Sequence, residues 1–400
     1  MAGATAPGLS VLHVSPYFAP AFRYGGPPRS ILGLCRALAR AGVRAEACTT
    51  TANGAGELPP SPPDGEWIDG IRVHRFPVAP PRRVFAARGL ARHLAEHLAA
   101  FDLVHVHGLW HAPGWLAGRQ ARRRGRPYVV SPRGMLDAGA LAHHGRRKRL
   151  AYWLLERRHL ARAALLHATS EAEARGLAGR GLGVDVAVIP NGVDLPGPAP
   201  ARGAMRQRHG LPPGAPLVVF LGRLHPIKRL DLVAQALDRV RAVRPEAWLV
   251  IAGPDEDGHR RRVAPLFQAS ADHVSWVDAV TADERHALLA EATALVLCSD
   301  SESFGLAVAE ALAAGVPVVT TRTVPWPAVE TEGCGFWVPQ TAEAVAAGLL
   351  ALLGDAEAAR RMGRRGQALV RERYGWEAVA RAMLDRYRAL VGVSSEVVAG

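Results

Sequence analysis

The sequence lacks any apolar run long enough to cross a membrane, and its first residues lack the basic start and apolar stretch of a secretory signal. Cysteine is scarce, and the four cysteines form no Cys-x-x-Cys pair, which argues against a disulfide scaffold or a cysteine-based zinc site. We therefore expect a globular chain in a reducing cytoplasm, with its cysteines as buried structural thiols.

Acidic residues are fewer than basic ones, 36 against 49, which gives a formal net charge of +13 that comes mostly from arginine. Two explanations remain open. A GC-rich genome would favour arginine, whereas a functional charge would attract nucleic acid, an acidic lipid surface or a phosphorylated substrate. No nucleic-acid recognition motif accompanies the charge, so we expect no nucleic-acid partner.

Buried strands alternate with helices nearly throughout the chain, which predicts parallel sheets covered by helices on both faces. The expected elements of the first series are strands at 9–14, 43–50, 71–76, 102–108, 126–131, 164–169 and 186–190, helices at 28–41 and 85–100, and a loop at 51–66. The second series comprises strands at 216–222, 247–253, 273–278, 294–299 and 316–321, followed by helices within 355–391.

A stretch rich in proline and glycine, 194–216, separates the two series and predicts a connection between domains. The expected fold is therefore α/β, with two Rossmann-like doubly wound domains that face a cleft. We expect the domains at 1–193 and 194–375, with a helix in 376–400 packing back on the first. In such sheets ligands bind at the carboxyl ends of the strands, so we look for site residues there.

Two cations directly follow the first strand of the second series. Arg223 and Lys228 lie in the segment GRLHPIK (222–228). An arginine fork and a lysine point charge suit a diphosphate. The alternative is that both are ordinary solvated loop charges, which are common at protein surfaces.

The segment after strand 294–299 carries two glutamates, Glu302 and Glu310, on either side of a turn. The turn residues are Ser303, Phe304, Gly305 and Leu306. Backbone N–H groups at the start of the following helix attract a phosphate or a sugar oxygen, and the glycine lets the backbone approach closely. Carboxylates accept hydrogen bonds from vicinal hydroxyls, so a ribose or hexose is a natural partner, although Glu310 alone could be an exposed helix charge.

In the first series, Gly25 and Gly26 precede a helix and would allow close approach to a phosphate or sugar. His107 lies nearest the carboxyl end of strand 102–108, on the same side as His105. A metal-binding role is poorly supported because no carboxylate or thiol accompanies the histidines at a ligand spacing. Arg133 lies at the end of the next strand.

Together these segments resemble the retaining GT-B glycosyltransferases of family 4, over nearly the full length. The most specific element is the pair of glutamates separated by seven residues, set in ESFGLAVAEALAAGVPVV (302–319). The segments GRLHPIK, IPNGVD (189–194) and GGPPRS (25–30) resemble the family's Gly-Arg-x4-Lys segment, its domain crossing and its glycine loop.

The resemblance implies a role for each residue. Arg223 and Lys228 would hold the donor diphosphate, Glu310 the ribose and Glu302 the transferred sugar. The turn Ser303–Leu306, Gly25 and Gly26 would contact the donor. His107 would contact the reacting sugar, and Arg133 and Asn191 would contact the acceptor or the donor. Many members of the family carry a different residue at the position of Arg133.

The resemblance also implies the reaction, which is transfer of a hexosyl unit from a UDP- or GDP-sugar to a saccharide or lipid-linked acceptor in polysaccharide or glycolipid biosynthesis. The anomeric configuration would be retained, without cofactor or metal, so the acidic cluster at 254–258 is interpreted as a solvated loop. A nucleotide-sugar epimerase of the same fold and a non-catalytic sugar-nucleotide binder remain alternatives.

The acceptor is expected on the first domain, where two basic amphipathic segments at 82–100 and 143–166 could contact an anionic membrane. The alternative is that they are ordinary surface helices. The expected location is the cytoplasm, in part at the inner face of the plasma membrane.

Overall fold

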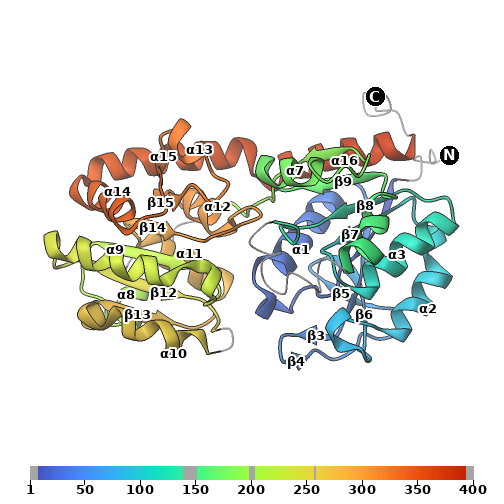
Figure 1. Ribbon diagram of the computed structural model, residues 1–400, viewed down its shortest axis with the longest axis horizontal. Helices are drawn as coiled ribbons and strands as arrows, with labels where there is room; N and C mark the ends of the chain where they lie inside the picture. Colours follow the sequence, from blue (N-terminus) through green and yellow to red (C-terminus); the bar gives the residue numbers. More distant parts are fainter. Residues whose placement is uncertain (1–7, 138–150, 198–202, 256–257, 393–400) are drawn as a thin grey trace, which may run out of the picture. The chain divides into compact units, whose positions relative to one another are not determined.

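The computed structural model describes residues 8–137, 151–197, 203–255 and 258–392. The chain divides into two units, shown in Figure 1. Unit 1 comprises the chain up to Gly192 together with the part from Trp376 onward, and unit 2 is Val193–Gly375. Each unit is a largely parallel sheet with helices packed on it, which confirms the expected pair of Rossmann-like α/β domains.

The sheet of unit 1 has eight strands in the order β10-β9-β8-β7-β1-β2-β6-β5. Their bounds are β1 Ser10–Val14, β2 Arg44–Thr50, β5 Glu66–Ile68, β6 Ile71–Phe76, β7 Leu103–His107, β8 Tyr128–Ser131, β9 Leu165–Ala168 and β10 Val186–Val188. All neighbours are parallel except β5 and β6, which are antiparallel at one edge.

The expected loop at 51–66 is partly wrong, because it contains a small hairpin of β3 (Ala52–Asn53) and β4 (Gly56–Glu57). Asn53 pairs with Gly56 across a two-residue loop that begins with Gly54 at φ 65°, and a glycine at the first loop position is a known hairpin signal. The Thr51 hydroxyl donates to a Glu57 carboxylate oxygen at 2.7 Å and ties the two ends.

The helices of unit 1 are α1 Gly26–Arg40, α2 Arg88–His97, α3 Ala112–Arg123, α6 Arg157–Leu160, α7 Glu171–Ala178 and α16 Trp376–Val391. Shorter turns are η1 Phe22–Tyr24, η2 Arg82–Val84, η3 Leu98–Ala100 and the π-helical η4 Tyr152–Glu156. The helix expected from residue 85 begins only at Arg88, because Phe85 is left-handed (φ 53°) and Ala87 is extended. Of the basic segment 143–166, residues 143–150 lie outside the described part.

The last helix, α16, packs on α1 and closes one face of the unit 1 sheet. Apolar residues of α16 such as Met383 and Tyr387 share a core with strand residues such as Val11 and Leu103. A Cβ atom on Gly33 of α1 would lie 2.1 Å from the Trp376 ring, so only glycine allows this close packing. The expected return of the C-terminal helix is confirmed.

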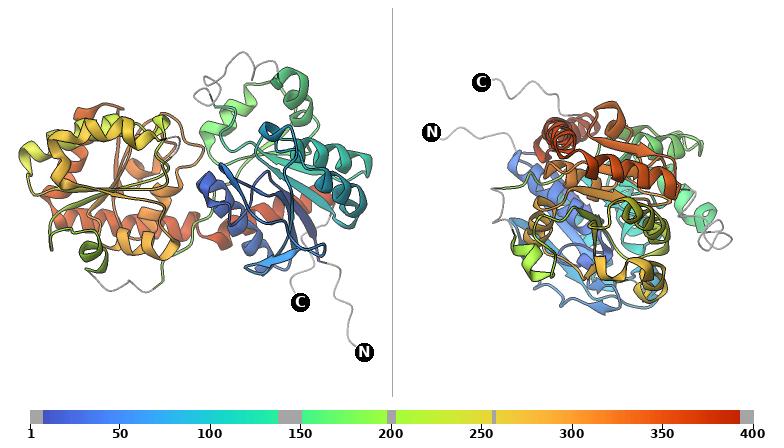
Figure 2. Two further views of the ribbon diagram at one scale, coloured as in Figure 1. Left: turned by 90° about the horizontal axis from the view of Figure 1, so that it is seen from below. Right: turned by 90° about the vertical axis from the view of Figure 1, so that its left-hand side faces the viewer.

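Unit 2 has a fully parallel six-stranded sheet in the order β13-β12-β11-β14-β15-β16, with helices on both faces (Figure 2). Its strands are β11 Leu217–Leu221, β12 Trp248–Ala252, β13 Val274–Val277, β14 Ala294–Leu297, β15 Val318–Thr321 and β16 Gly335–Val338. Its helices are α8 Ala204–Arg208, α9 Leu230–Val243, α10 His259–Val263, α11 Ala282–Ala290, α12 Leu306–Ala313, α13 Ala328–Thr331, α14 Ala342–Gly354 and α15 Ala356–Arg373, with turns η5 Pro226–Lys228 and η6 Ala264–His273.

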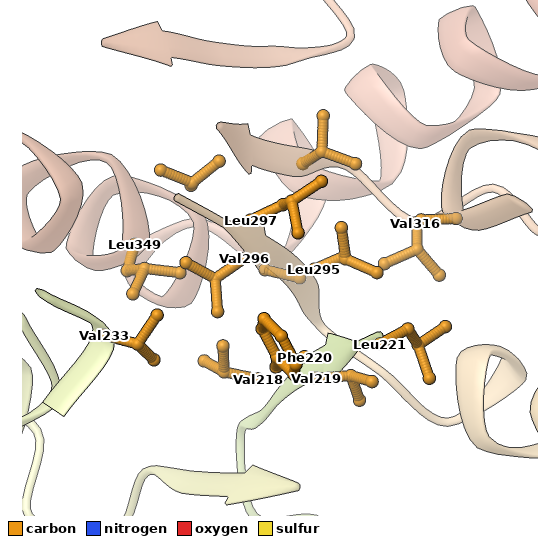
Figure 3. Close-up of a cluster of buried hydrophobic side chains, with 14 of the residues drawn as sticks. Val218, Val219, Phe220, Leu221, Val233, Leu295, Val296, Leu297, Val316 and Leu349 are labelled. Carbon is orange, nitrogen blue, oxygen red and sulfur yellow. The ribbon is translucent and has the colours of Figure 1, made fainter. Parts of the chain in front are cut away.

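The core of unit 2 is built on the two central strands, β11 and β14, whose valines and leucines fill the space around Phe220 (Figure 3). Each fully buried side chain of this size contributes about 1.5–3 kcal/mol relative to exposure. The edge strand β16 was not expected. It pairs closely with β15, since a Cβ atom on Gly335 would lie 2.1 Å from the Val318 carbonyl oxygen.

The chain passes between the units at Gly192–Val193 and returns at Gly375–Trp376. The Val193 N–H donates to the Tyr374 carbonyl at 2.9 Å. The stretch expected as a connection, 194–216, contains α8, whose Met205 N–H donates to Glu291 at 3.1 Å. Residues 198–202 of this stretch are not described. None of the described helices combines the length and apolar character needed to span a bilayer.

Candidate active site

Lys228 and Glu302, from loops that follow β11 and β14, form an ion pair in unit 2. The Ser299 hydroxyl donates to the same carboxylate oxygen, Oε1, at 2.8 Å. The two charged side chains are 15% and 14% exposed, so water reaches them only partly. These two sequence-predicted residues therefore contact each other, and Ser299 is a neighbour that sequence reasoning missed.

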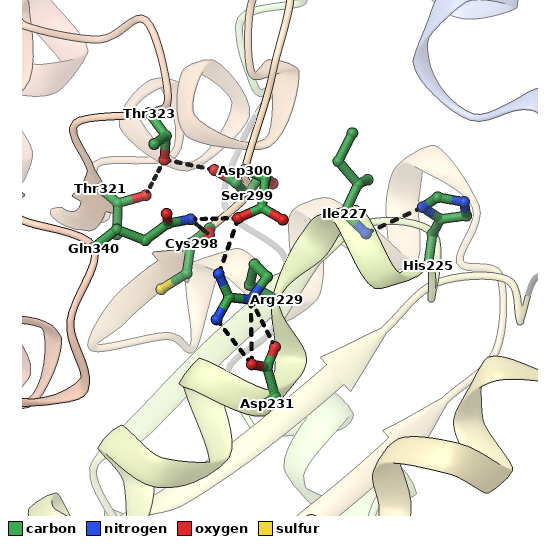
Figure 4. Close-up of polar contacts among 10 residues, drawn as sticks. All are labelled: His225, Ile227, Arg229, Asp231, Cys298, Ser299, Asp300, Thr321, Thr323 and Gln340. Carbon is green, nitrogen blue, oxygen red and sulfur yellow. Dashed lines mark hydrogen bonds and ion pairs between the residues drawn. The ribbon is translucent and has the colours of Figure 1, made fainter. Parts of the chain in front are cut away.

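A polar network fixes the two loops relative to each other (Figure 4). Arg229 is left-handed (φ 52°), pairs with Asp231 through two nitrogens, and also pairs with Asp300 at 3.0 Å. The Asp300 N–H donates to the Ile227 carbonyl at 2.8 Å, and the Gln340 amide donates to Asp300 at 3.0 Å. The positions of Lys228 and Glu302 are thus set by contacts on both sides.

The turn before α12 is held against Trp326. Gly305 is the N-cap residue at φ 85°, and a Cβ atom there would lie 3.2 Å from the Trp326 ring. The Trp326 indole N–H donates to the Phe304 carbonyl. No side chain caps the helix, so its first backbone N–H groups, with the helix dipole, suit an anionic or sugar oxygen.

Glu310 of α12 forms an ion pair with Arg285 of α11. Arg285 is 8% exposed, and its Nε has no hydrogen-bond partner in the described part of the chain. Sequence reasoning missed Arg285. A Thr281–Glu284 capping box marks the start of its helix, but nothing in the sequence pairs a residue of α11 with one of α12. Arg223 is half-buried in the turn after β11.

In unit 1, Gly25 is the N-cap residue of α1 at φ 79°, and Gly26 is its first residue. Two prolines follow, and proline has no N–H to offer a ligand. Gly25 and Gly26 are half-buried.

His107 is 1% exposed, and both of its ring nitrogens are engaged. Its Nδ1 lies 3.1 Å from the Arg133 guanidinium, and its Nε2 lies 2.9 Å from Nδ1 of His13. A guanidinium only donates, so Nδ1 of His107 accepts and Nε2 carries the proton that is donated to His13. His13 must then be protonated at Nε2, a buried donor without an acceptor among the described residues.

A second chain of hydrogen bonds involves His167, Ser131 and His105, and all of its donors point the same way along the chain. His167 donates from Nε2 to the Ile189 carbonyl at 2.7 Å, so its Nδ1 accepts from the Ser131 hydroxyl at 2.6 Å. Ser131 in turn accepts from Nε2 of His105, whose Nδ1 accepts from the Tyr387 hydroxyl of α16 at 2.5 Å. Every lone pair on the His105 and His167 rings is used.

Burial keeps these histidines neutral. It lowers the pKa of His13 to about 3 and that of His167 to about 4, and lowers the pKa of His105 and His107 well below the usual range. Ring nitrogens of His13, His105 and His107 lie within 4.8 Å of one another, which is close enough for a metal ion. Their lone pairs, however, already accept hydrogen bonds that a metal would have to displace.

Of the acidic cluster at 254–258, Asp255 accepts a hydrogen bond from the Arg260 N–H at 3.0 Å, and residues 256–257 are not described. All four cysteines are buried and free, as expected. Their burial raises the pKa of each thiol; that of Cys334 rises to about 11.

Two family profiles match the chain. Residues 25–192 match the family described as "Glycosyl transferase 4-like domain", and residues 201–369 match "Glycosyl transferases group 1".

Curated relatives cover the same length. A D-inositol 3-phosphate glycosyltransferase from Kineococcus radiotolerans is 32% identical over 96% of this chain and 95% of its own length. The protein of the same name from Xylanimonas cellulosilytica is 33% identical over 97% and 98%.

Solved structures share the fold. A sucrose-phosphate synthase from Thermosynechococcus elongatus superposes with a TM-score of 0.75 at 23% identity, covering 96% of this chain and all of that one. The HepE protein of Anabaena, in complex with UDP-glucose, gives a TM-score of 0.73 at 18% identity, covering 95% and 100%.

Proposed function

Since the chain belongs to the group 1 glycosyl transferases and has the GT-B fold, we propose that it moves a hexosyl unit from a UDP- or GDP-sugar to a saccharide or lipid-linked acceptor. The relatives act, by their names, on an inositol phosphate, and the HepE structure holds UDP-glucose. Unit 2 would bind the donor and unit 1 the acceptor.

The Lys228–Glu302 ion pair is the observation that carries this proposal. It joins a cation suited to a diphosphate with a carboxylate suited to sugar hydroxyls, at the carboxyl ends of two adjacent parallel strands. A nucleotide-sugar presents both groups in one molecule. Donor binding would replace the ion pair with two ligand contacts, lysine to phosphate and glutamate to sugar.

The leaving group gains negative charge as the bond to the sugar breaks. Arg223 and Lys228, with the N–H groups of Gly305 and Leu306 at the start of α12, would stabilise that charge where it develops. Glu310 would accept from the ribose hydroxyls, and Ser303 and Phe304 would contact the donor. Gly25 and Gly26 would border the diphosphate.

We also propose that transfer retains the anomeric configuration and needs no metal or cofactor. The acceptor hydroxyl would attack on the face of the leaving group, and its proton would pass to a donor phosphate oxygen. The nucleotide-sugar and the acceptor alcohol are thus converted to a glycoside and a nucleoside diphosphate, which carries the proton of the acceptor hydroxyl. His107 would contact the transferred sugar by exchanging its bond to His13 for one to a sugar hydroxyl.

The test is the thermal stability of the protein with UDP, GDP, UDP-glucose, UDP-N-acetylglucosamine and GDP-mannose. A ligand at a hundred times its Kd adds about 2.7 kcal/mol. We expect one nucleotide series to stabilise the protein and Lys228→Ala and Glu310→Ala to abolish the effect. Arg239→Ala, which removes an exposed charge paired with Glu343, is the control.

No stabilisation by any of these ligands would contradict the proposed donor site. If a donor binds, the reaction is followed by NMR with and without a chelator. An inverted product or a metal requirement would contradict the proposed mechanism, and epimerised donor without any acceptor would favour the epimerase alternative.

An exposed apolar turn favours contact with an anionic membrane as well. Trp153 and Leu154 are each 65% exposed in η4, and Leu155 is 46% exposed. The Arg157 guanidinium lies 5.2 Å from the Trp153 ring centroid, and Arg158 is exposed beside it. Apolar side chains next to arginines suit the interface of an acidic lipid surface.

The measurement is co-sedimentation with vesicles of phosphatidylglycerol and phosphatidylcholine. We expect Trp153→Ser with Leu154→Ser to reduce binding to the acidic vesicles. Equal binding by the wild type and this variant would reject the turn as a membrane contact.

A further inference from the structure

Arg133 of unit 1 is held in one position by three hydrogen bonds that it donates. Its Nη1 donates to the Ser30 hydroxyl of α1 at 2.8 Å and to the Asn191 side-chain oxygen at 3.2 Å, and its Nη2 donates to Nδ1 of His107 at 3.1 Å. The residue itself is left-handed, at φ 56°, which costs energy for a residue with a side chain. The chain therefore keeps this guanidinium in place against its backbone preference.

Among the described residues no carboxylate forms an ion pair with the Arg133 guanidinium. Glu173 is the carboxylate with the strongest electrostatic attraction to the Arg133 guanidinium. Its oxygens, however, accept hydrogen bonds from the Gly134 N–H at 2.6 Å and from the Thr169 N–H at 2.8 Å. Burial lowers the pKa of Arg133 to about 10, so the group is still charged at neutral pH. A partly buried, unpaired charge is unfavourable and marks a candidate functional site.

The three side-chain atoms that Arg133 contacts each accept a hydrogen bond from it. The Ser30 hydroxyl accepts from Arg133 while donating to the Pro27 carbonyl at 3.1 Å. The Asn191 oxygen and Nδ1 of His107 are likewise already accepting. Nε of Arg133 is an N–H group without a partner in the described part of the chain. A positive charge combined with an unpaired donor fits an anion and does not fit a metal ion.

We propose that Arg133 is the cation of an anion-binding subsite in unit 1, held by Ser30, Asn191 and His107, which takes a phosphate or carboxylate group of a substrate. As a substrate subsite it rests on the proposed function, since it presupposes that sugar is transferred to an acceptor bound on unit 1. The anion has two candidate sources, the acceptor and the donor diphosphate. An acceptor source would restrict the enzyme to phosphorylated or acidic saccharides.

The direct test titrates inorganic phosphate at constant ionic strength and follows binding by calorimetry. All variants carry Lys228→Ala, which removes a cation of the proposed donor site. Arg133→Met should weaken phosphate binding by about tenfold to a hundredfold, because a hydrogen-bonded charge is lost. The control Arg123→Met removes the same charge from an exposed position on α3 and should change the affinity less than about twofold.

Asn191→Asp separates binding from a purely structural role. It places a carboxylate at the position of an oxygen that already lies 3.2 Å from Nη1, so the cation gains an internal partner. We expect the variant to melt at a higher temperature than the parent and yet to lose phosphate binding. Retained phosphate binding by Asn191→Asp, or a loss in Arg133→Met no larger than in Arg123→Met, would overturn the proposal.

A second experiment identifies the source of the anion and uses proteins that keep Lys228. The UDP affinity of Arg133→Met and Asn191→Asp is compared with that of the wild type. An unchanged UDP affinity assigns the subsite to the acceptor, and a loss parallel to that for phosphate assigns it to the donor diphosphate. The phosphate arm involves neither nucleotide-sugar nor transfer, so it tests Arg133 even if the proposed function fails.

Discussion

Lys228 and Glu302 lie 74 positions apart in the sequence and form an ion pair with each other. The lysine is therefore neutralised by the carboxylate that we propose for the sugar. A donor must break this pair, and it can do so because it supplies a phosphate to one partner and hydroxyls to the other. A ligand with only a diphosphate leaves Glu302 to compete for the same lysine.

Replacing Glu302 by Gln should therefore separate binding of the nucleotide from transfer of the sugar. We expect Glu302→Gln to bind UDP about threefold to tenfold more tightly, since Lys228 is released, and to transfer sugar at least about tenfold more slowly. Calorimetry with UDP and a transfer assay measure the two effects. Glu343→Gln removes an equally negative side chain from an exposed pair and should leave both unchanged. Weaker UDP binding by Glu302→Gln would contradict this account.

Arg285 and Glu310 should be energetically coupled. Removing either partner alone leaves a partly buried charge unpaired, so Arg285→Leu and Glu310→Leu should each destabilise unit 2 by about 1–3 kcal/mol. The double variant should lose less than the sum, which urea denaturation of the four proteins measures. Additive losses would mean that the ion pair makes no contribution to the fold.

Gly305 should not tolerate a side chain. Gly305→Ala would place a Cβ atom 3.2 Å from the Trp326 ring in a left-handed conformation, at a cost of about 1–2 kcal/mol. We expect lower stability and weaker donor binding, because the turn before α12 must shift. Gly179→Ala, on the helical C-cap of α7 in unit 1, is the matched control. Donor binding equal to that of the wild type would show that this turn does not contact the ligand.

Glu156 should give the protein an unusual dependence of stability on pH. Its Oε1 accepts from the Trp110 N–H at 2.5 Å and from the Trp115 indole at 2.9 Å, while Oε2 is buried without a partner in the described part of the chain. Burial raises the pKa of Glu156 from 4.5 to about 7. Between pH 4.5 and 7 the folded state holds a proton that the unfolded state has lost, so this contribution falls as pH rises.

The effect is read as the difference in unfolding free energy between the wild type and Glu156→Gln, which mimics the protonated form. Relative to the variant, the wild type should lose at most about 3 kcal/mol between pH 4.5 and 7. The comparison with the variant is needed because the buried histidines change the unfolding free energy with pH in the opposite direction. Their lowered pKa values, about 3 for His13 and His159, destabilise both proteins as pH falls below 6.5. A difference independent of pH would exclude a raised pKa at Glu156.

Much of the fold could be predicted because it depends on local patterns. Runs of valine and leucine between helices marked the parallel strands, and Gly315 marked the end of α12. The pattern failed where a local conformation overrode it. Phe85 adopts a left-handed conformation that a helix-forming sequence does not predict. Gly335 weakened the strand pattern of β16, although the close packing of this edge strand on β15 requires a glycine there.

Only those site residues that belong to a sequence motif could be predicted. Lys228 was predicted from its position after a strand, and it is one of two lysines, with Lys148, in a chain rich in arginine. Its contact with Glu302 depends on the strand order, because β11 and β14 are neighbours in the sheet, and the structure was needed to show that order. The partners Arg285 and His13 could not be found this way, because their contacts depend on side-chain directions between elements whose order in space the sequence does not specify.

The return of α16 to unit 1 has a consequence for how the chain is made. Unit 2 is an insertion between two pieces of unit 1, and the Tyr387 hydroxyl that begins the His105 chain arrives with the last helix. On the ribosome, unit 2 can fold as soon as Gly375 has emerged, whereas unit 1 cannot complete its core until α16 has also emerged. A premature stop codon after Gly375 would thus leave unit 2 whole and deprive unit 1 of part of its core.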